Sequence, residues 1–154
     1  MLKIADDLTD FLEGGLSILL GSVDAQGRPE CTRATGVEVE RGGARVTLFV
    51  PTATSARTLA NLQHDPRTAI TFSRPYDYRT LQLKGRAVAI HEPNAEQAIV
   101  QERWHAGFVE QLAIVGIARA LSRRIRLRPS MAITVAVDEI FEQTPGPGAG
   151  RRMS

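Results

Sequence analysis

Residues 79–91, RTLQLKGRAVAIH, carry the clearest structural signal in this chain. Apolar residues alternate with polar ones along this segment, with Leu81, Leu83, Ala87 and Ala89 set against Thr80, Gln82, Lys84 and Arg86. Because successive side chains of a β-strand point to opposite faces, the alternation predicts one long strand with one face in the core. The second face of this strand is unusually polar.

Five more strands are predicted on either side of this one, at residues 16–23, 31–39, 45–50, 68–73 and 131–141. Turn residues separate the early strands, at 24–27 and at Gly42-Gly43. Only short helices are expected, at residues 4–12, 52–63 and 95–112. Six strands with tight turns predict a mainly β protein with a closed or partly closed antiparallel barrel, since closure removes exposed sheet edges.

The composition is that of an ordinary globular protein, with 154 residues, 43% hydrophobic and 23% charged. This length predicts one domain, residues 1–143, followed by a Pro/Gly-rich tail, residues 144–154, that cannot hold regular structure by itself. The tail is expected to be disordered or held by a partner. No apolar run approaches the roughly 18 residues that span a bilayer, and the N-terminus does not look like a secretory signal. These two features predict that the protein has no membrane partner. Cys31 is the single cysteine, so no disulfide can form within the chain, which fits a reducing compartment and predicts a cytoplasmic protein.

Several classes of site are not supported by the sequence. His64, His91 and His105 lie far apart without acidic neighbours at metal-ligand spacing, so no metal site is predicted. The chain has no nucleophile elbow, phosphate-binding loop or dinucleotide-binding loop. Residues 119–128 are rich in arginine and would place Arg119, Arg123 and Arg126 on one face of a helix. The net charge is only +2, and no aromatic residues are interleaved with the arginines, so no nucleic-acid partner is predicted.

One segment has the composition of a phosphate site. Residues 52–58, TATSART, follow a predicted strand directly and open a predicted helix. Hydroxyl groups, free amides and an arginine at a helix N-terminus can bind phosphate, because the helix dipole is positive there. Serine and threonine also cap helices routinely, so a purely structural role is an equal alternative.

Four blocks follow one another along the chain, namely Arg33, TSART at 54–58, NLQHDPR at 61–67 and RTLQLKG at 79–85, with a weaker match at 141–143. Taken in this order, they resemble the pyridoxamine 5′-phosphate oxidase-like family of flavin-binding split barrels. It implies a six-stranded antiparallel split β-barrel. It also implies a homodimer with one FMN in each of two clefts at the subunit interface.

The resemblance assigns roles to nine residues by position. Arg33, Ala34 and Thr35 would line the flavin, Thr54, Ser55, Arg57 and Thr58 would hold its phosphate, and Thr80 or Gln82 would reach the ring. No catalytic side chain is required, because the isoalloxazine ring carries the electron chemistry. Arg33 would favour the reduced, anionic flavin. The alternative for Arg33 is an exposed strand residue paired with Glu30 or Glu38.

The chain departs from the true pyridoxamine phosphate oxidases near its C-terminus. Those enzymes carry a Phe-Trp-Gln-Gly-Gly stretch and an Arg-x-His pair, whereas this chain continues from Phe141-Glu142-Gln143 into a Pro/Gly-rich tail. We therefore expect an FMN-dependent oxidoreductase acting on a small molecule other than pyridoxamine phosphate, with NAD(P)H or another electron donor. One alternative is the deazaflavin F420, whose oligoglutamate tail would suit residues 119–128 or Arg151 and Arg152. The other alternative is a non-catalytic flavin-binding carrier or sensor.

Overall fold

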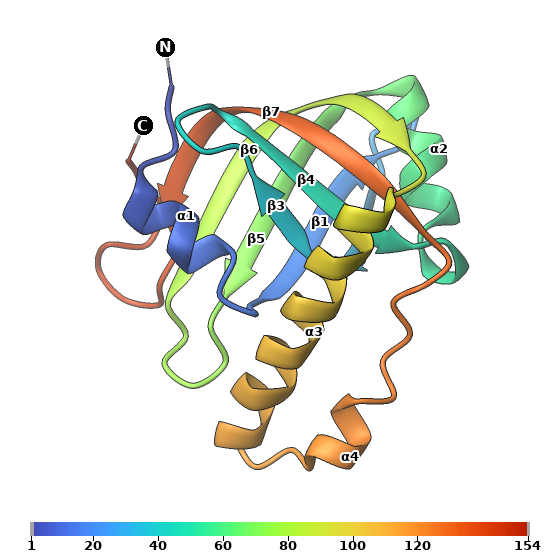
Figure 1. The fold of residues 1–154 in the computed structure, drawn as a ribbon. Coiled ribbons are helices and arrows are strands. Elements are labelled where there is room, and N and C mark those ends of the chain that lie inside the picture. The colour runs from blue at the N-terminus through green and yellow to red at the C-terminus, as the bar shows by residue number, and fades with distance from the viewer. Residues whose placement is uncertain (1, 154) are drawn as a thin grey trace.

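The structure is a computed structural model that describes residues 2–153, and it is mainly β (Figure 1). Met1 and Ser154, the end residues of the predicted domain and tail, lie outside the described residues. One antiparallel sheet contains all the strands that the described residues form, which are β1 (Ser17–Val23), β2 (Pro29–Ala34), β3 (Val37–Val39), β4 (Arg45–Pro51), β5 (Arg67–Ser73), β6 (Thr80–His91), β7 (Ser130–Glu142) and β8 (Arg151–Arg152). The predicted fold class is confirmed.

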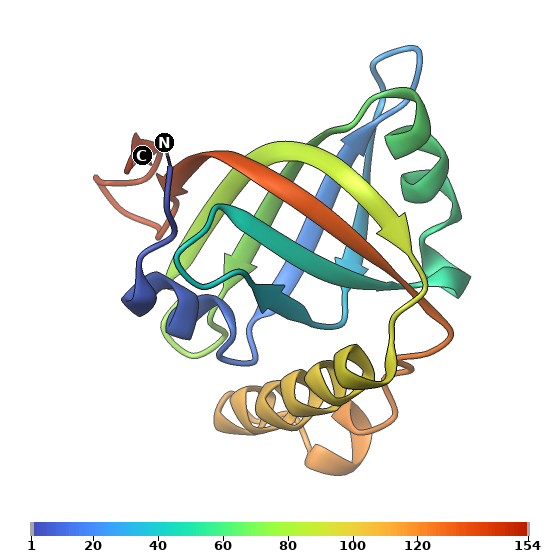
Figure 2. The ribbon, with the colours of Figure 1, turned by 45° about the horizontal axis from the view of Figure 1, so that its top comes forward.

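The sheet curls until its two end strands meet. Its strand order is β2-β1-β5-β6-β7-β4-β3, and β2 runs into β3 through Thr35 and Gly36. The Thr35 N–H donates to the Phe49 carbonyl at 2.7 Å, and the Phe49 N–H donates to the Gly36 carbonyl at 3.1 Å. These two bonds join the segment that follows β2 to β4, so the two ends of the curled sheet, which Figure 2 shows from a second side, lie next to each other.

The predicted strand 31–39 is therefore wrong as one continuous element. Gly36 has φ +146°, a conformation that side-chain-bearing residues rarely adopt, and it breaks the segment into β2 and β3. Because of this break, β2 pairs with β1 whereas β3 pairs with β4. A single chain segment thus forms both ends of the curled sheet.

The predicted alternation holds in the first half of β6 and places the core inside the barrel, but the register shifts between Ala87 and Ala89, so the prediction that Ala89 faces the core is wrong and Ala89 is exposed. Leu81 and Leu83 of β6 are fully buried, as are Ile18 and Leu20 of β1 and Phe72 of β5. The residues between them face outward, and Gln82, Lys84 and Leu19 keep part of their surface exposed. Full burial of side chains of this size contributes about 1.5–3 kcal/mol each, which explains why the inner face is so uniformly apolar.

The helices lie outside the sheet (Figure 1). They are α1 (Asp6–Leu12), the short 3₁₀ helix η1 (Thr52–Thr54), α2 (Ala56–His64), α3 (Ala95–Ile114) and α4 (Arg119–Ser122). A capping box between Asn94 and Gln97 starts α3. The predicted helix at 52–63 is divided into η1 and α2 at Ser55.

Helix α3 packs with its middle against the turn between α1 and β1. Gly107 of α3 meets Gly15, which has φ +71°, and a Cβ on Gly15 would lie 2.6 Å from the Gly107 carbonyl carbon. Trp104 and Phe108 are both buried, their ring centroids are 4.8 Å apart, and the Trp104 indole N–H donates to the Leu16 carbonyl at 2.9 Å. Trp104 and Phe108 are therefore packing residues that hold α3 against the barrel.

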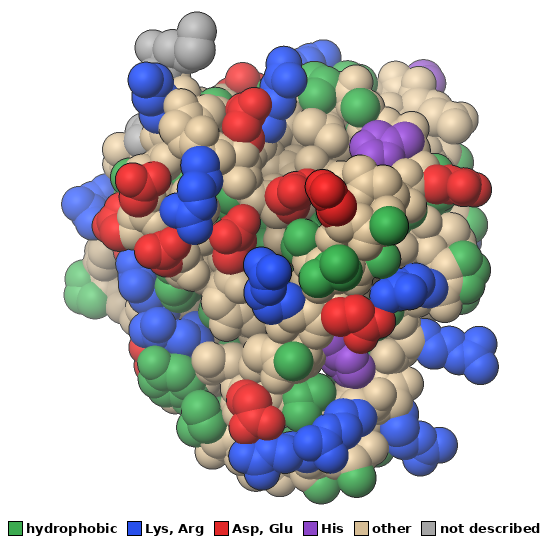
Figure 3. All heavy atoms as spheres, in the orientation of Figure 1, with side chains coloured by type: hydrophobic (Ala, Val, Ile, Leu, Met, Phe, Trp, Pro, Cys, Tyr) green, Lys and Arg blue, Asp and Glu red, His purple; other side chains and the backbone are tan. Residues whose placement is uncertain are grey.

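The arginine-rich segment does not form the predicted helical face. Helix α4 ends at Ser122, so Arg126 lies beyond it in an irregular segment. Arg119, Arg123 and Arg124 are exposed, and basic side chains gather at the foot of the molecule (Figure 3). Arg119 forms an ion pair with Glu110 at 2.8 Å.

The C-terminal tail is ordered along the described residues, contrary to the expectation of disorder or a partner. Arg151 and Arg152 form β8, which pairs with Glu142 and Phe141 of β7. The Met153 N–H donates to the Ile140 carbonyl at 2.7 Å. The tail therefore folds back on its own barrel, because the glycines at 146, 148 and 150 make a turn tight enough to return the chain to β7.

Among the described helices, none has the length and apolar character needed to cross a membrane.

Candidate functional site

The outward face of the sheet brings two of the predicted residues, Arg33 and Gln82, into one row. The register pairs Arg33 of β2 with Leu19 of β1, Leu19 with Thr71 of β5, and Thr71 with Gln82 of β6. Directly opposite residues in antiparallel strands lie about 4.5–5.5 Å apart, so this row is continuous. The Gln82 amide donates to the Thr71 hydroxyl at 3.3 Å. Arg33 and Gln82 thus lie on the same face, separated by two strands.

The next row on this face consists of small side chains. Gly21 lies between Cys31 and Ala69, and Ala69 pairs with Lys84. These three small residues contribute to the lining of a shallow cavity of about 610 Å³, the remainder of whose lining is Ser22, Val23, Pro29, Glu30, Arg67 and Thr68. A floor of glycine, alanine and cysteine leaves the space that a flat ring needs.

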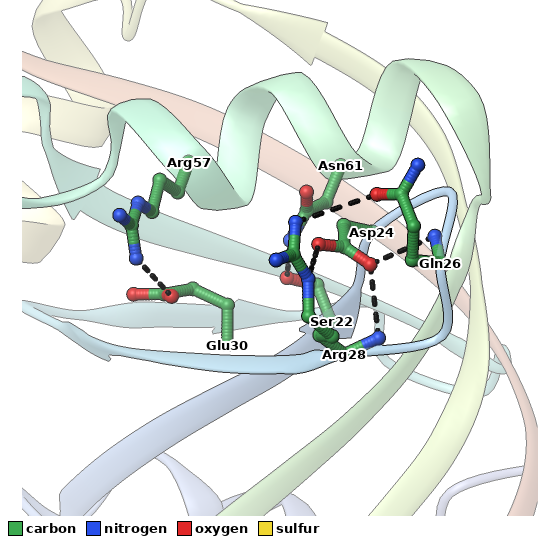
Figure 4. A network of polar contacts seen from close by, with 7 residues as sticks. All are labelled: Ser22, Asp24, Gln26, Arg28, Glu30, Arg57 and Asn61. Atoms are coloured by element: carbon green, nitrogen blue, oxygen red, sulfur yellow. Dashed lines mark hydrogen bonds and ion pairs between the residues drawn. The ribbon is translucent and has the colours of Figure 1, made fainter.

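Helix α2 begins beside this cavity (Figure 4). Arg57, in its first turn, is 84% exposed and lies 3.4 Å from the Glu30 carboxylate. A second, more polar cavity of about 360 Å³ is lined by Asp24, Arg28, Pro29, Glu30, Arg57 and Asn61. Pro29 and Glu30 line both cavities. The two spaces are therefore neighbours, one with an apolar floor and one with a cation.

Hydrogen bonds fix α2 against the β1–β2 hairpin. The Asn61 amide donates to the buried Ser22 hydroxyl at 3.1 Å. At the hairpin tip, Arg28 donates from its backbone and its guanidinium to Asp24, and the backbone bond is the largest cause that holds the pKa of Asp24 below its ordinary value. The ion pair of Arg57 with Glu30 is exposed and contributes little stability, so Arg57 can exchange its partner at small cost.

The other predicted phosphate residues differ in accessibility. Thr54 is exposed, whereas Ser55 and Thr58 are buried. The Ser55 hydroxyl lies 3.0 Å from the Thr32 hydroxyl and makes no cap bond to the first amides of α2. Within the part of the chain that the structure describes, the Thr58 hydroxyl has no hydrogen-bond partner. The first turn of α2 thus keeps donor capacity that its own side chains do not use.

The remaining predicted residues are held by structural contacts. Ala34 belongs to the core, and the Thr35 hydroxyl donates to the Phe49 carbonyl. Thr80 is nearly buried, and its hydroxyl is within bonding distance of the Tyr78 carbonyl, 2.8 Å, and of the Ser73 hydroxyl, 3.0 Å. None of these three side chains lines either of the two cavities.

Arg33 is an exposed strand residue, as its structural alternative predicted, but the pairing with Glu30 or Glu38 that this alternative included is wrong. Its guanidinium donates to the Ser17 hydroxyl at 2.8 Å, while Glu30 pairs with Arg57 and Glu38 accepts from the Gln97 amide at 3.3 Å. Arg33 is exposed on the outward face.

Comparison with known proteins identifies the family of this chain. A family model described as pyridoxamine 5′-phosphate oxidase matches residues 4–143. The chain belongs to this family. No curated protein sequence matches.

Solved structures with the family fold are similar to this chain at low identity. An F420 reductase matches at TM-score 0.59 and 16% identity, covering 85% of this chain and 93% of its own. A pyridoxinephosphate oxidase family protein from Clostridium acetobutylicum matches at TM-score 0.55 and 15% identity, covering 96% and 92%. The heme storage protein HutZ from Vibrio cholerae matches at TM-score 0.52 and 17% identity, covering 92% and 95%. Proteins that share this fold are therefore named for different cofactors.

Sequence reasoning missed the small-residue floor. Gly21, Cys31 and Ala69 come from three strands, and nothing in their local sequence marks them. The signal that could have found them is the alternation of each strand combined with the register, which the turn lengths set only in part.

Proposed function

We propose that this protein is an FMN-binding flavoprotein that acts as an oxidoreductase on a small molecule other than pyridoxamine phosphate. The observation that carries the proposal is the pair of adjoining cavities, one over the Gly21 and Ala69 floor and one beside Arg57. The first suits a flat apolar ring and the second suits a phosphate. Bound flavin would supply the electron chemistry, and the chain would bind and orient it.

The start of α2 would hold the phosphate. Arg57 would donate from its guanidinium, and the amides of the first turn would donate along the helix dipole. The donor set fits such a group, because Ser55 leaves the first amides of α2 uncapped and the buried Thr58 hydroxyl lacks a partner among the described residues. Thr54, being exposed, could add a hydroxyl contact.

The row on the outward face would hold the ring. Gln82 lies on this face, and Arg33 places a positive charge on the same face. A reduced flavin bears negative charge, and a fixed cation beside it stabilises that form without reorganisation. Ala34 and Thr35 would contribute through the position of β2, since their side chains face the core.

We also propose that the working unit is a homodimer with FMN at the interface, in the cytoplasm. Leu19, at the centre of the outward row, is 38% exposed although it is a large apolar residue. A second copy on this face would cover Leu19 and close the shallow cavity, whose floor alone cannot enclose a ring. Light scattering with and without FMN measures the oligomeric state.

The decisive test is a fluorescence titration of FMN into flavin-free protein. Arg57→Ala removes a charge-assisted phosphate contact, so FMN affinity should fall by roughly 1.5–3 kcal/mol, about 10- to 150-fold. Glu30→Gln frees Arg57 from its carboxylate and should strengthen binding. Arg41→Ala is the matched control, because Arg41 is also exposed and paired, with Asp10 at 3.1 Å, but lines neither cavity. Unchanged affinity in Arg57→Ala refutes the phosphate site.

The same titration separates the alternative functions. Selective uptake of the deazaflavin F420, the substrate or cofactor class named for one structural neighbour, would replace FMN in the proposal. Uptake of hemin with no flavin binding would favour heme binding, as named for another neighbour. Tight FMN binding without reduction by NADH or NADPH would favour a carrier or sensor over an NAD(P)H-dependent enzyme.

A further inference from the structure

A second groove of about 500 Å³ lies where the β5–β6 hairpin approaches α3. It is distinct from the two cavities near α2, with which it shares no lining residue. Its walls come from β1, β2, the end of β5 with the following hairpin, α3, and the segment after α4. The lining residues are Ser17, Arg33, Ser73, Arg74, Pro75, Tyr78, Phe108, Leu112 and Ile125.

One wall of this groove is apolar and rigid. Phe108 is 4% exposed and stacks on Trp104 with an angle of 20° between the rings. Leu112 lies one helical turn further along α3, and Ile125 packs against the same core. Such a wall favours a ligand with an apolar surface, because contact with the wall removes that surface from water.

The groove contains positive charge with no acidic residue in its lining. Arg74 already has a carboxylate partner, since its guanidinium binds both oxygens of Asp77 at 2.9 and 2.6 Å. Arg33 donates to the uncharged Ser17 hydroxyl, and across residues 2–153 no carboxylate lies within ion-pair distance of it. One guanidinium is therefore available, and its planar fork matches a carboxylate.

Tyr78 stands at the rim in an unfavourable backbone conformation. Its φ is +58°, in the left-handed region that favours glycine, and its side chain is 68% exposed, so burial does not offset the strain. The hairpin enforces this conformation, because the Tyr78 N–H donates to the Arg74 carbonyl at 2.9 Å and the Tyr78 carbonyl accepts from Thr80. Strained residues of this kind occur preferentially at binding sites.

From these observations we infer that the groove binds an aryl-substituted monocarboxylate. The carboxylate accepts from Arg33, the apolar part lies on Phe108 and Leu112, and the Tyr78 ring covers it. Arg33 also belongs to the row proposed to face the flavin ring, so the ligand would lie beside the cofactor. That this ligand is the substrate rests on the proposed function. Binding of the carboxylate in the groove does not require FMN.

The test is titration of flavin-free protein with hydrocinnamate and with its neutral analogue, hydrocinnamamide. Trp104 is the only tryptophan in the chain, and it stacks on the groove wall, so its fluorescence reports occupancy directly. Calorimetry provides an independent measure. The expected result is saturable binding in which the carboxylate binds roughly tenfold or more tightly than the amide.

Variants assign the contacts. Arg33→Gln should remove the preference for the carboxylate while leaving amide binding unchanged. Tyr78→Gly should weaken both ligands to a similar degree without lowering the unfolding midpoint, since glycine accepts this φ. Arg103→Gln is the control, because Arg103 is exposed on α3 but does not line the groove.

The outcomes are separable from those of the flavin titration. Equal affinity for acid and amide, or no loss of preference in Arg33→Gln, overturns the carboxylate assignment. Absence of binding for both compounds overturns the groove as a ligand site, even if FMN binds. Carboxylate binding in a protein that takes up no FMN sustains the groove and refutes the flavoprotein.

Discussion

Replacing Gly15 by alanine should destabilise the protein much more than the same change at Gly42. The two glycines have nearly the same backbone conformation, φ +71° and φ +72°. They differ in their surroundings. A Cβ on Gly15 would lie 2.6, 2.8 and 2.9 Å from backbone atoms of Gly107 and Phe108, whereas a Cβ on Gly42 would have no neighbour within 4 Å.

The size of the effect follows from this comparison. A left-handed conformation costs an alanine about 1–2 kcal/mol at either site. Only at Gly15 must the backbone of α3 also move, and such overpacking costs typically about 1–3 kcal/mol. The loss of unfolded-state entropy is common to both variants and cancels. The free energy of unfolding of Gly15→Ala should therefore be about 1–3 kcal/mol lower than that of Gly42→Ala.

Urea unfolding of both variants measures this difference, and binding provides a second readout. Phe108 follows Gly107 directly, so a displaced α3 should weaken hydrocinnamate binding in Gly15→Ala while FMN affinity stays unchanged. Equal unfolding free energies for the two variants would refute the close-approach argument. So would a destabilised Gly15→Ala protein with normal hydrocinnamate binding, because α3 would then not have moved.

Two further predictions concern side chains away from the proposed cofactor site. Gln101→Leu should lower the free energy of unfolding by about 1–3 kcal/mol in urea melts. The side chain of Gln101 is fully buried, and its amide N–H groups donate to the Leu127 carbonyl and the Ser130 hydroxyl. The Arg74 hydrogen bonds lower the pKa of Asp77 from 3.8 to about 2. A carboxyl whose pKa is lower in the folded state than in the unfolded chain stabilises the fold at pH values above its unfolded pKa, and this stabilisation is lost as the pH falls through its folded pKa. The difference in urea midpoint between wild type and Asp77→Asn should therefore shrink as the pH falls from 4 towards 2.

Strands were predictable where one face is buried and one is not. The alternation in residues 79–91 identifies β6 within one residue at its start. The break at Gly36 was not predictable, because residues 31–39 keep a strand-like composition on both sides of it. What ends β2 there is the pair of bonds to Phe49, which lies in a different strand. A glycine inside a strand pattern is the only local sign of such a break.

In the C-terminal tail, the sequence predicts less regular structure than the chain forms. Its prolines and glycines correctly exclude a long regular element, yet Arg151 and Arg152 still pair with β7. Propensity describes an isolated segment, and an exposed strand edge can supply the hydrogen bonds that the segment lacks. The prediction of one helical face at residues 119–128 is wrong for a similar reason. Helical spacing of the arginines does not by itself keep the chain helical beyond Ser122.

The candidate site combines local and non-local information, and this determines which parts of it the sequence could indicate. Thr54, Ser55, Arg57 and Thr58 are close in sequence, so a motif can represent the start of α2. Arg33 and Gln82 come together only through the register of four strands, and the Gly21 floor and the Phe108 groove involve no motif at all. In the proposed cofactor site, the sequence therefore predicts mainly the residues that would bind the phosphate. The substrate end that we propose lies where the hairpin at Tyr78 and helix α3 meet, because Arg33, which has no carboxylate partner within residues 2–153, lines the same groove there as the apolar Phe108.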